Sequence, residues 1–192
     1  MRSPVRDLVA KNLPSTFSSY PKTRVIIDAT EFHVEKPFRP HAQKSTWSNY
    51  KQSNTFKLLV DNMPSGAITF LSKLYSGSIS DQHITQKSGL VDLIEEEEDD
   101  VMADRGFNIR HLLLTKHCTL NIPSFSHCKA MSSKALKRSR SIALVRIHVE
   151  RAIRRMETYK VLAGIIPLVL RFTLNQIVTI VAVLCNLQPK LA

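Results

Sequence analysis

Cysteine is scarce in this sequence of 192 residues, and its three cysteines, Cys118, Cys128 and Cys185, are too few for the disulfide framework of a secreted protein. The N-terminal segment also lacks an apolar core of signal-peptide length. Together these absences predict a reducing, intracellular compartment. His117 and His127 each directly precede a cysteine, which does not match the usual spacing of paired ligands in structural zinc sites, so zinc is not expected.

Long hydrophobic runs are absent as well. The most apolar stretch, residues 161–187, contains one charged residue, Arg171, and several polar residues interrupt it. Its uninterrupted part, residues 177–185, is much shorter than the ~20 residues that a membrane-spanning helix needs, so a membrane partner is not expected. We predict a buried helix there, with Asn175 as its N-cap and Pro189 beyond its end.

Acidic residues are outnumbered by basic ones, because 16 Asp and Glu against 27 Lys and Arg leave a formal net charge of +11. Ten of the basic residues and only two acids fall between residues 129 and 160, so a net charge of +8 is concentrated in one segment. Such a concentration predicts a polyanionic partner rather than a device for solubility. The hydrophobic fraction of 43% and the chain length suit one folded domain with a sizeable core.

Residues 139–160 contain neither proline nor glycine, and their pattern predicts one long helix. Apolar side chains recur every three or four residues and would form its buried face: Ile142, Val145, Val149, Ala152, Met156 and Tyr159. A second stripe places Glu150 between Arg146 and Arg154. This stripe has two interpretations, namely a surface helix with ordinary ion pairs, or a metal-binding glutamate held on a basic helix beside DNA.

Two short apolar runs each end in an aspartate. Residues 24–28 are typical of a strand that is buried on both faces and ends at Asp28, and residues 101–103 predict a short strand followed by Asp104. An aspartate at the end of such a strand lies at the rim of the sheet, where α/β proteins bind ligands. Asp28 suits an Asx turn or a cap equally well.

The segments between these strands predict further elements. Residues 55–61 and 67–75 suit the two strands of a hairpin, because the residues between them are rich in turn formers. A short helix over residues 82–88 follows, with Asp81 as its N-cap. The consecutive acids at residues 95–100 suit a solvated turn, since adjacent carboxylates cannot converge on one ion.

Two stretches are expected to be irregular. Residues 35–54 interleave basic residues with aromatic ones, which suits contact with phosphates and bases, but a surface loop with Trp47 tucked into the core explains the pattern at least equally well. Residues 115–137 predict an exposed loop, and the basic cluster at residues 134–140 suits nuclear targeting or phosphate binding.

In order, these elements predict an α/β domain built around a mixed sheet that is flanked by helices. Asp28, Asp104 and Glu150 come from distant parts of the chain, at successive intervals of 76 and 46 residues, two of them closing strands and the third lying on a helix. Three such carboxylates can converge on Mg²⁺ or Mn²⁺, which take carboxylate oxygens as ligands. The surrounding positive charge would then hold a DNA backbone.

Several phrases, in the same order, resemble the DDE-type transposase domain of the PIF/Harbinger-like superfamily. They are VIIDATE (25–31), STWSNYK (45–51), PSGAITF (64–70), LYSGSISD (74–81), DVMADRGF (100–107), LNIPSF (120–125) and SIALVRIHVERAIRR (141–155). The resemblance covers nearly everything from residue 20 to residue 189. It implies an RNase H-like fold, with residues 21–190 as the nuclease domain and residues 1–20 as an N-terminal arm.

The resemblance also implies what the domain does. Asp28, Asp104 and Glu150 fall on the three acids that bind a divalent cation, Mg²⁺ or Mn²⁺, for the cleavage of DNA phosphodiester bonds, whereas Asp81 belongs to the family's pattern but not to this triad. The expected partners, in the nucleus, are DNA, a second copy of the chain forming a homodimer, and a separate DNA-recognition protein. The cations expected to contact DNA are Lys44, Lys51, Arg105, Arg146, Arg151, Arg154 and Arg155.

The sequence departs from the family's pattern in three places. We expect no DNA-recognition module, of the kind that members usually carry, before Asp28. Residues 95–98 replace a shorter turn, and residues 126–138 are shortened relative to the usual loop. The triad is intact, so we expect a metal-dependent nuclease. The alternative is a domesticated transposase relic that binds DNA or a protein partner and does not cut.

Overall fold

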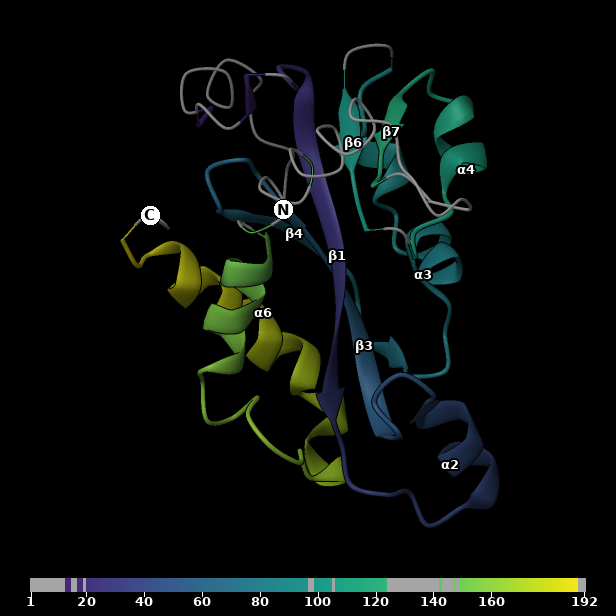
Figure 1. Ribbon diagram of the computed structural model, residues 1–192. Helices are drawn as coiled ribbons and strands as arrows, with labels where there is room; N and C mark the ends of the chain where they lie inside the picture. Colours follow the sequence, from purple (N-terminus) through teal and green to yellow (C-terminus); the bar gives the residue numbers. More distant parts are fainter. Residues whose placement is uncertain are drawn as a thin grey trace, which may run out of the picture.

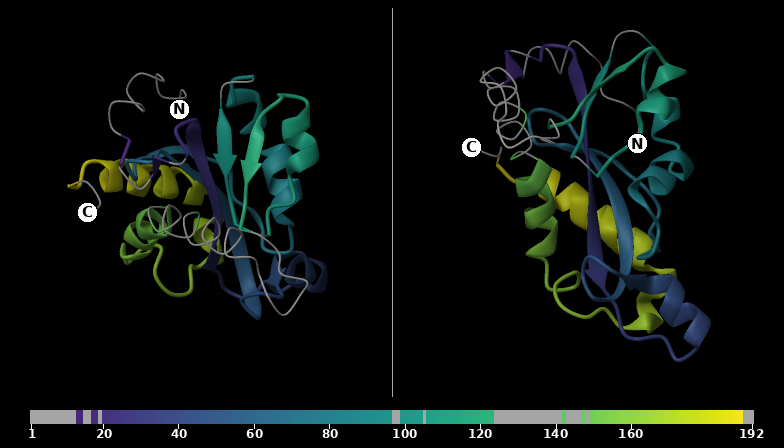
Figure 2. Two further views of the ribbon diagram at one scale, coloured as in Figure 1. Left: turned by 45° about the horizontal axis from the view of Figure 1, so that its top comes forward. Right: turned by 45° about the vertical axis from the view of Figure 1, so that its right-hand side comes forward.

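The computed structural model describes residues 13–14, 17–18, 20–96, 99–104, 106–123, 142, 147 and 149–189. In this part of the chain a mixed sheet lies between two layers of helices (Figures 1 and 2). The strands are β1 (Thr23–His33), β2 (Trp47–Ser48), β3 (Ser53–Asn62), β4 (Ile68–Leu71), β5 (Tyr75–Ser76), β6 (Asp100–Met102) and β7 (Thr119–Asn121). The helices are α2 (Pro40–Thr46), α3 (Asp81–Lys87), η2 (Val91–Leu93), α4 (Arg110–Leu114), η3 (Leu168–Phe172), α6 (Leu174–Asn186) and helical residues 149–157. This architecture confirms the predicted α/β class and the RNase H-like arrangement of a mixed sheet flanked by helices.

β1 is the central strand of the sheet. It pairs antiparallel with β3 on one side and parallel with β6 on the other, and β7 continues the parallel part beyond β6. β2, β4 and β5 all pair antiparallel with β3. The strand order β2-β3-β1-β6-β7 therefore places an antiparallel half and a parallel half on the two sides of one strand.

Successive side chains of β1 point to two separate hydrophobic clusters, as the prediction of a strand buried on both faces requires. Ile26 and Phe32 pack in the cluster that α6 and helical residues 149–157 complete, whereas Val25 and Ile27 pack in the cluster of α3 and α4. Figure 2 shows these two pairs of helices on opposite sides of the sheet. A residue's place in β1 therefore decides which helical layer its side chain meets.

β1 does not end at Asp28, as the apolar run predicted, but continues to His33. The polar residues after Asp28 stay in the strand because each of them pairs with β3. Asp28 nevertheless lies at a rim of the sheet, because the parallel partner β6 ends at Met102, which is opposite Ile26. The aspartate therefore lies just past the end of the neighbouring strand.

The predicted hairpin is confirmed, with a shorter second strand. β3 and β4 pair across a turn in which Gly66 has a φ of 85°, a conformation that suits glycine because it has no Cβ. The turn is closed by a hydrogen bond of 2.9 Å from the backbone nitrogen of Met63 to the carbonyl oxygen of Ala67. β4 ends at Leu71, and β5 then pairs with a different part of β3.

Both segments that were predicted to be irregular contain regular structure. Residues 35–54 include α2 and β2, and Trp47 in β2 is 41% exposed, so the one of the two interpretations that placed it in the core is wrong. The predicted loop at residues 115–137 includes β7, because the backbone of β6 offers hydrogen-bonding groups that a further parallel strand satisfies. The basic cluster at residues 134–140 lies outside the described residues.

The short helix after β5 is α3, but its cap differs from the prediction. Ser80 is the N-cap, and its hydroxyl accepts a hydrogen bond of 3.2 Å from the backbone nitrogen of His83. Asp81 is the first residue of the helix, which leaves its carboxylate available for a contact elsewhere. The helix ends before Gly89, which has a φ of 80°, as a residue beyond a helix C-terminus often does.

The predicted C-terminal helix is α6, but only part of it is buried: Leu174, Val178 and Val181 are among its buried residues, whereas Ile180, Val183 and Leu184 are exposed. Asn175 is not its N-cap, because Thr173 precedes the helix and the side chain of Asn175 accepts a hydrogen bond from a backbone nitrogen before β5. No helix in the part of the chain that the structure describes is long and apolar enough to cross a membrane.

The acid run before β6 is not simply a solvated turn. Asp99 is only 2% exposed, and its carboxylate lies 2.5 Å from the guanidinium group of Arg24, which also binds Glu95 at 2.9 Å. A buried carboxylate requires such a partner, because charge without pairing is costly in a protein interior. The ion pair attaches the segment before β6 to β1.

Candidate functional site

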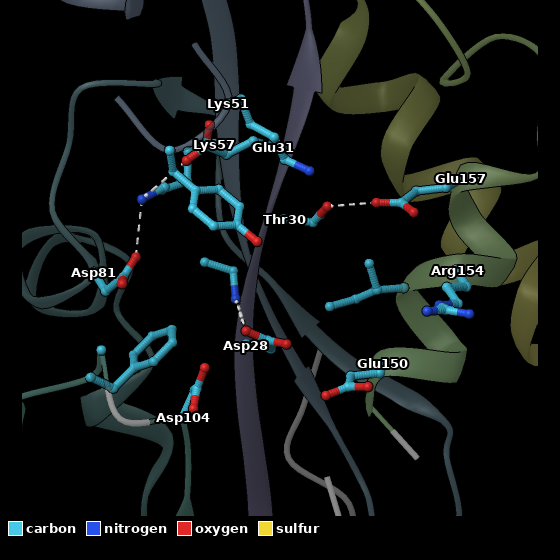
Figure 3. Close-up of a pocket in the computed structure, with 15 residues that line it drawn as sticks. Asp28, Thr30, Glu31, Lys51, Lys57, Asp81, Asp104, Glu150, Arg154 and Glu157 are labelled. Carbon is cyan, nitrogen blue, oxygen red and sulfur yellow. Dashed lines mark hydrogen bonds and ion pairs between the residues drawn. The ribbon is translucent and has the colours of Figure 1, made fainter. Parts of the chain in front are cut away.

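A cleft of about 560 Å³ opens where β6 ends beside β1. Its walls are β1, the turn after β6, the start of α3 and helical residues 149–157 (Figure 3). Asp28, Asp104 and Glu150, which the sequence predicted to act together, all line this cleft. Figure 3 shows their carboxylates turned toward the same space, each from a different element.

The register of the sheet brings Asp28 and Asp104 together. β1 and β6 pair in parallel with Ile26 opposite Met102, so the partners differ by 76 in residue number. Asp28 and Asp104 are separated by the same 76 residues, and each follows this pair by two residues. Since side chains two residues apart in a strand share a face, the interval between the two acids is the interval that the register requires.

Helical residues 149–157 supply the third acid. Their apolar face is buried in the larger cluster, which confirms the predicted face at Val149, Ala152 and Met156. Glu150 lies on the exposed side of this helix, and Arg154 follows it one turn later on the wall of the same cleft. The stripe that carried two interpretations is therefore part of the cleft wall, with Arg146 outside the described residues.

A hydrogen bond joins this helix to the strand that carries Asp28. The hydroxyl of Thr30 donates to the carboxylate of Glu157 at 2.9 Å, across a separation of 127 residues in the sequence. Thr30 lies two residues after Asp28 on the same face of β1, and Glu157 lies about two helical turns after Glu150. This one contact therefore connects the strand that carries Asp28 to the helix that carries Glu150.

A second set of contacts lies on the opposite face of β1. The ammonium group of Lys57 in β3 lies 3.4 Å from the Glu31 carboxylate and 3.0 Å from the Asp81 carboxylate. Glu31 also accepts a hydrogen bond of 2.9 Å from the hydroxyl of Thr55. Glu31 is buried and Lys57 is half-buried, and their opposite charges compensate each other there.

The turn that carries Asp104 rests against Asp81. The backbone nitrogen of Phe107 donates to the carbonyl oxygen of Asp104 at 3.1 Å, and the Phe107 side chain is buried in the cluster of α3 and α4. A Cβ placed on Gly106 would lie 3.1 Å from the Asp81 carboxylate. The absence of a side chain at Gly106 therefore allows the turn to approach α3 this closely.

The cleft is acidic within a basic protein. Among the described residues that line it, six acids outnumber three cations, which gives a local charge of −3 where the whole chain has +11. The acids are Asp28, Glu31, Asp81, Asp104, Glu150 and Glu157, and the cations are Lys51, Lys57 and Arg154. An excess of carboxylate oxygens is the donor set that Mg²⁺ and Mn²⁺ prefer. Within the described part of the chain, no three His, Cys, Asp or Glu side chains are already gathered into a metal-binding cluster.

A comparison with known families decides the classification. The pattern of the DDE superfamily endonuclease family matches residues 27–186, a span that contains all three acids. The chain belongs to this family. A comparison with curated proteins finds no match. All three acids line the cleft of this DDE endonuclease domain.

The cations that were predicted to contact DNA occupy different places in the DDE endonuclease domain. Lys51 and Arg154 line the cleft, whereas Lys44 is exposed on α2 and Arg151 is exposed on helical residues 149–157. Arg155 is half-buried and donates a hydrogen bond of 2.8 Å to the carbonyl oxygen of Pro189. The two remaining predicted cations lie outside the described residues, namely Arg105 and Arg146.

Four residues that line the cleft and form two contacting pairs were not predicted from the sequence, namely Thr30 with Glu157 and Glu31 with Lys57. A signal for two of them was present, because Thr30 follows Asp28 at the spacing of one strand face and Glu157 follows Glu150 at about two helical turns. Lys57 gave no such signal, because its partners come from β1 and α3 and only the folded sheet brings them together.

Proposed function

We propose that this DDE endonuclease domain cleaves DNA phosphodiester bonds with the help of a divalent cation, Mg²⁺ or Mn²⁺. The observation that supports the proposal most strongly is that Asp28, Asp104 and Glu150, from three distant segments, line one acidic cleft. Like charges that line one cleft repel one another unless a cation compensates them. The donor set fits such a cation, because all three groups are carboxylates.

Asp28 and Asp104 would hold the cation from the sheet, and Glu150 would hold it from the helix. A cation bound there supplies activation of the attacking water and stabilisation of the leaving oxygen. Arg154 lies one turn from Glu150 on the cleft wall, where its guanidinium group would bind a phosphate beside the scissile bond. Lys51, at the other side of the cleft, would hold a second phosphate.

The neighbourhood of Lys51 supports a nucleic acid as substrate rather than a small phosphoester. Tyr50 also lines the cleft and is 84% exposed, and the ammonium group of Lys51 lies 5.4 Å from the centre of its ring. Phe38 and Trp47, before and after α2, are 97% and 41% exposed. Exposed aromatic rings among cations suit bases stacked next to bound phosphates.

Binding of DNA or of a protein without cleavage is the second candidate function, as in a domesticated relic. One observation favours it, namely that the described carboxylates are not yet gathered into a three-ligand cluster. In this case the exposed aromatic and basic residues would bind the partner, and the acids would have lost their joint function. For the nuclease, the expected partners are DNA, a second copy of the chain in a homodimer and a separate DNA-recognition protein, and the expected location is the nucleus.

Titration calorimetry with MnCl₂ tests the proposal on three proteins. The wild type and Asp92→Asn, a control on the exposed surface of η2, are expected to bind Mn²⁺ with a dissociation constant of roughly millimolar or below, as few-ligand carboxylate sites do. Asp104→Asn is expected to lose this binding. Nicking of supercoiled plasmid DNA should then require Mn²⁺ and should stop in Asp104→Asn. Metal-independent DNA binding without nicking by the wild type would support the second function.

A further inference from the structure

Two sets of contacts leave β1 from neighbouring residues directly after Asp28. Thr30 points to the helical layer that carries Glu150, and Glu31 points to the layer that carries α3 (Figure 3). Adjacent residues of a strand face opposite sides, so a single dipeptide reaches both layers. The contacts of Thr30 reach the helix that carries Glu150, and the contacts of Glu31 reach the start of α3, which lies against the turn that carries Asp104.

The contact between Thr30 and Glu157 fixes the helix where hydrophobic packing alone would not. Apolar contacts are not directional, so the buried face of helical residues 149–157 sets the distance of the helix from the sheet more strongly than its axial position. A hydrogen bond of 2.9 Å is directional and sets that position. Sliding by one turn would move Glu150 by about 5.4 Å along the helix axis relative to Asp28.

The contacts of Glu31 fix the turn that carries Asp104. Glu31 holds the Lys57 ammonium group, which holds the Asp81 carboxylate at 3.0 Å. That carboxylate lies against Gly106, two residues after Asp104. The ammonium group of Lys57 also donates to the carbonyl oxygen of Ile79 at 3.2 Å, so the start of α3 is held at two points.

We propose that Thr30 and Glu31 are positioning residues that hold Glu150 and Asp104 in place around Asp28, acting through Glu157 and through Lys57 with Asp81. The proposal rests on the proposed function, since it assumes that the three acids bind one cation together. It assigns Glu157 and Asp81 to the support of the site, although both are carboxylates in the same cleft. Groups that orient metal ligands in this way typically change metal affinity by about 10–100-fold when they are removed.

The first experiment measures Mn²⁺ affinity by titration calorimetry in variants of the pair Thr30 and Glu157. Thr30→Val and Glu157→Ala are each expected to weaken binding about tenfold. The double variant should bind no more weakly than either single variant, because both changes remove the same contact. Thr30→Ser and Glu157→Gln keep a donor and an acceptor, so both should retain wild-type affinity. Thr179→Val on α6 is the matched control, because the Thr179 hydroxyl bonds only locally, to the Asn175 carbonyl oxygen.

The second experiment treats the other set of contacts in the same way. Asp81→Ala is expected to weaken Mn²⁺ binding about tenfold, whereas Asp81→Asn keeps an acceptor for Lys57 and should bind like the wild type. Asp92→Ala, at an exposed position of η2, is the control. Circular dichroism of each variant shows whether it is folded. Where an alanine variant is not folded, the comparison rests on Thr30→Val and on the three conservative variants, Thr30→Ser, Glu157→Gln and Asp81→Asn.

The outcomes separate the positioning role from the proposed function. Mn²⁺ binding that Asp28→Asn abolishes but Thr30→Val and Asp81→Ala leave unchanged would overturn the positioning role and leave the proposed function standing. Equal losses in Glu157→Gln and Glu157→Ala would also overturn it, since they would make Glu157 a direct ligand. A folded wild type that binds no Mn²⁺ would overturn the proposed function, and the positioning role with it.

Discussion

Replacing Asp61 with asparagine is expected to stabilise the protein at neutral and alkaline pH. Asp61 lies in β3 and is 5% exposed, and burial raises the pKa of its carboxyl from 3.8 to about 7. Hydrogen bonds from the Thr69 hydroxyl at 2.7 Å and from the backbone nitrogen of Ile26 at 3.0 Å, and the charge of Arg24, oppose this rise but do not cancel it. The folded protein therefore holds the proton of the Asp61 carboxyl more tightly than the unfolded chain does.

The sign of the pH dependence follows from this difference. Between pH 3.8 and about 7 the folded protein holds a proton at Asp61 that the unfolded chain has released, so the free energy of unfolding decreases as the pH rises. A tenfold change in proton affinity corresponds to about 1.4 kcal/mol, so the whole decrease is about 4 kcal/mol. This is a large part of a typical stability of about 5–15 kcal/mol.

Asparagine has no charge to bury, and it can keep both contacts. Its carbonyl oxygen can accept from Ile26, and its amide nitrogen can donate to the Thr69 hydroxyl. The free energy of unfolding of Asp61→Asn, relative to the wild type, is therefore expected to rise by about 3 kcal/mol between about pH 4.5 and pH 8. Urea denaturation at both pH values measures it, with exposed Asp92→Asn as the control. A difference that does not change with pH would refute the reasoning, because the pKa of Asp61 would then be the same in the folded and unfolded states.

Three further substitutions test local features of the fold. Ser80→Ala removes the N-cap of α3 and should lower the free energy of unfolding by about 1 kcal/mol in urea denaturation, whereas an unchanged value would show that the cap is dispensable. Gly77→Ala would place a Cβ against the Thr55 hydroxyl oxygen, closer than side-chain atoms can pack, so we expect a loss of about 3 kcal/mol, and a normal melting temperature would contradict the tight packing there. Gly106→Ala would press on the Asp81 carboxylate and should weaken Mn²⁺ binding about tenfold with little change in melting temperature; wild-type affinity would argue against the contact.

The places of Asp28, Asp104 and Glu150 in the fold could be predicted because each lies in a pattern with a local cause, whereas their joint role as a triad is what the family resemblance implies. The period of the helix placed Glu150 beside a buried apolar face, and the short apolar runs placed Asp28 and Asp104 after buried strand residues. The same patterns gave the α/β class, since strands of this kind alternate with helical segments. Such patterns are reliable because the apolar face that they create on a helix or strand is the face that becomes buried when the protein folds.

The features that the sequence did not predict depend on contacts between distant residues. β1 extends past Asp28 because β3 pairs with polar residues that show no apolar pattern. Ser80 rather than Asp81 caps α3, and two neighbouring residues that both suit a cap can be told apart only when Lys57 is seen to bind Asp81. β7 has three residues, too few for a period, and exists because β6 lies beside it.

The acid run gives another example of a tertiary effect. A chain of consecutive carboxylates suits a solvated turn, and Glu96 behaves in this way as an exposed residue near Lys116. Asp99 is buried instead, because Arg24 in β1 supplies a charge from a strand 75 residues away. Composition predicts the average environment of such a run, but it does not show which single member a distant cation selects.

The central position of β1 also orders the assembly of the molecule. β1 pairs with β3 across 22 to 36 residues of sequence, with β6 across 76 residues, and contacts the helix of Glu150 across 127 residues. The entropic cost of closing a loop rises with its length, and contacts between distant residues slow folding. Forming the antiparallel pair of β1 and β3, which carries Asp28, therefore has the lowest entropic cost. Bringing Asp104 to it closes a longer loop, and bringing Glu150 to it closes the longest one. During refolding, a signal from the completed cleft should therefore lag behind the signal from the sheet.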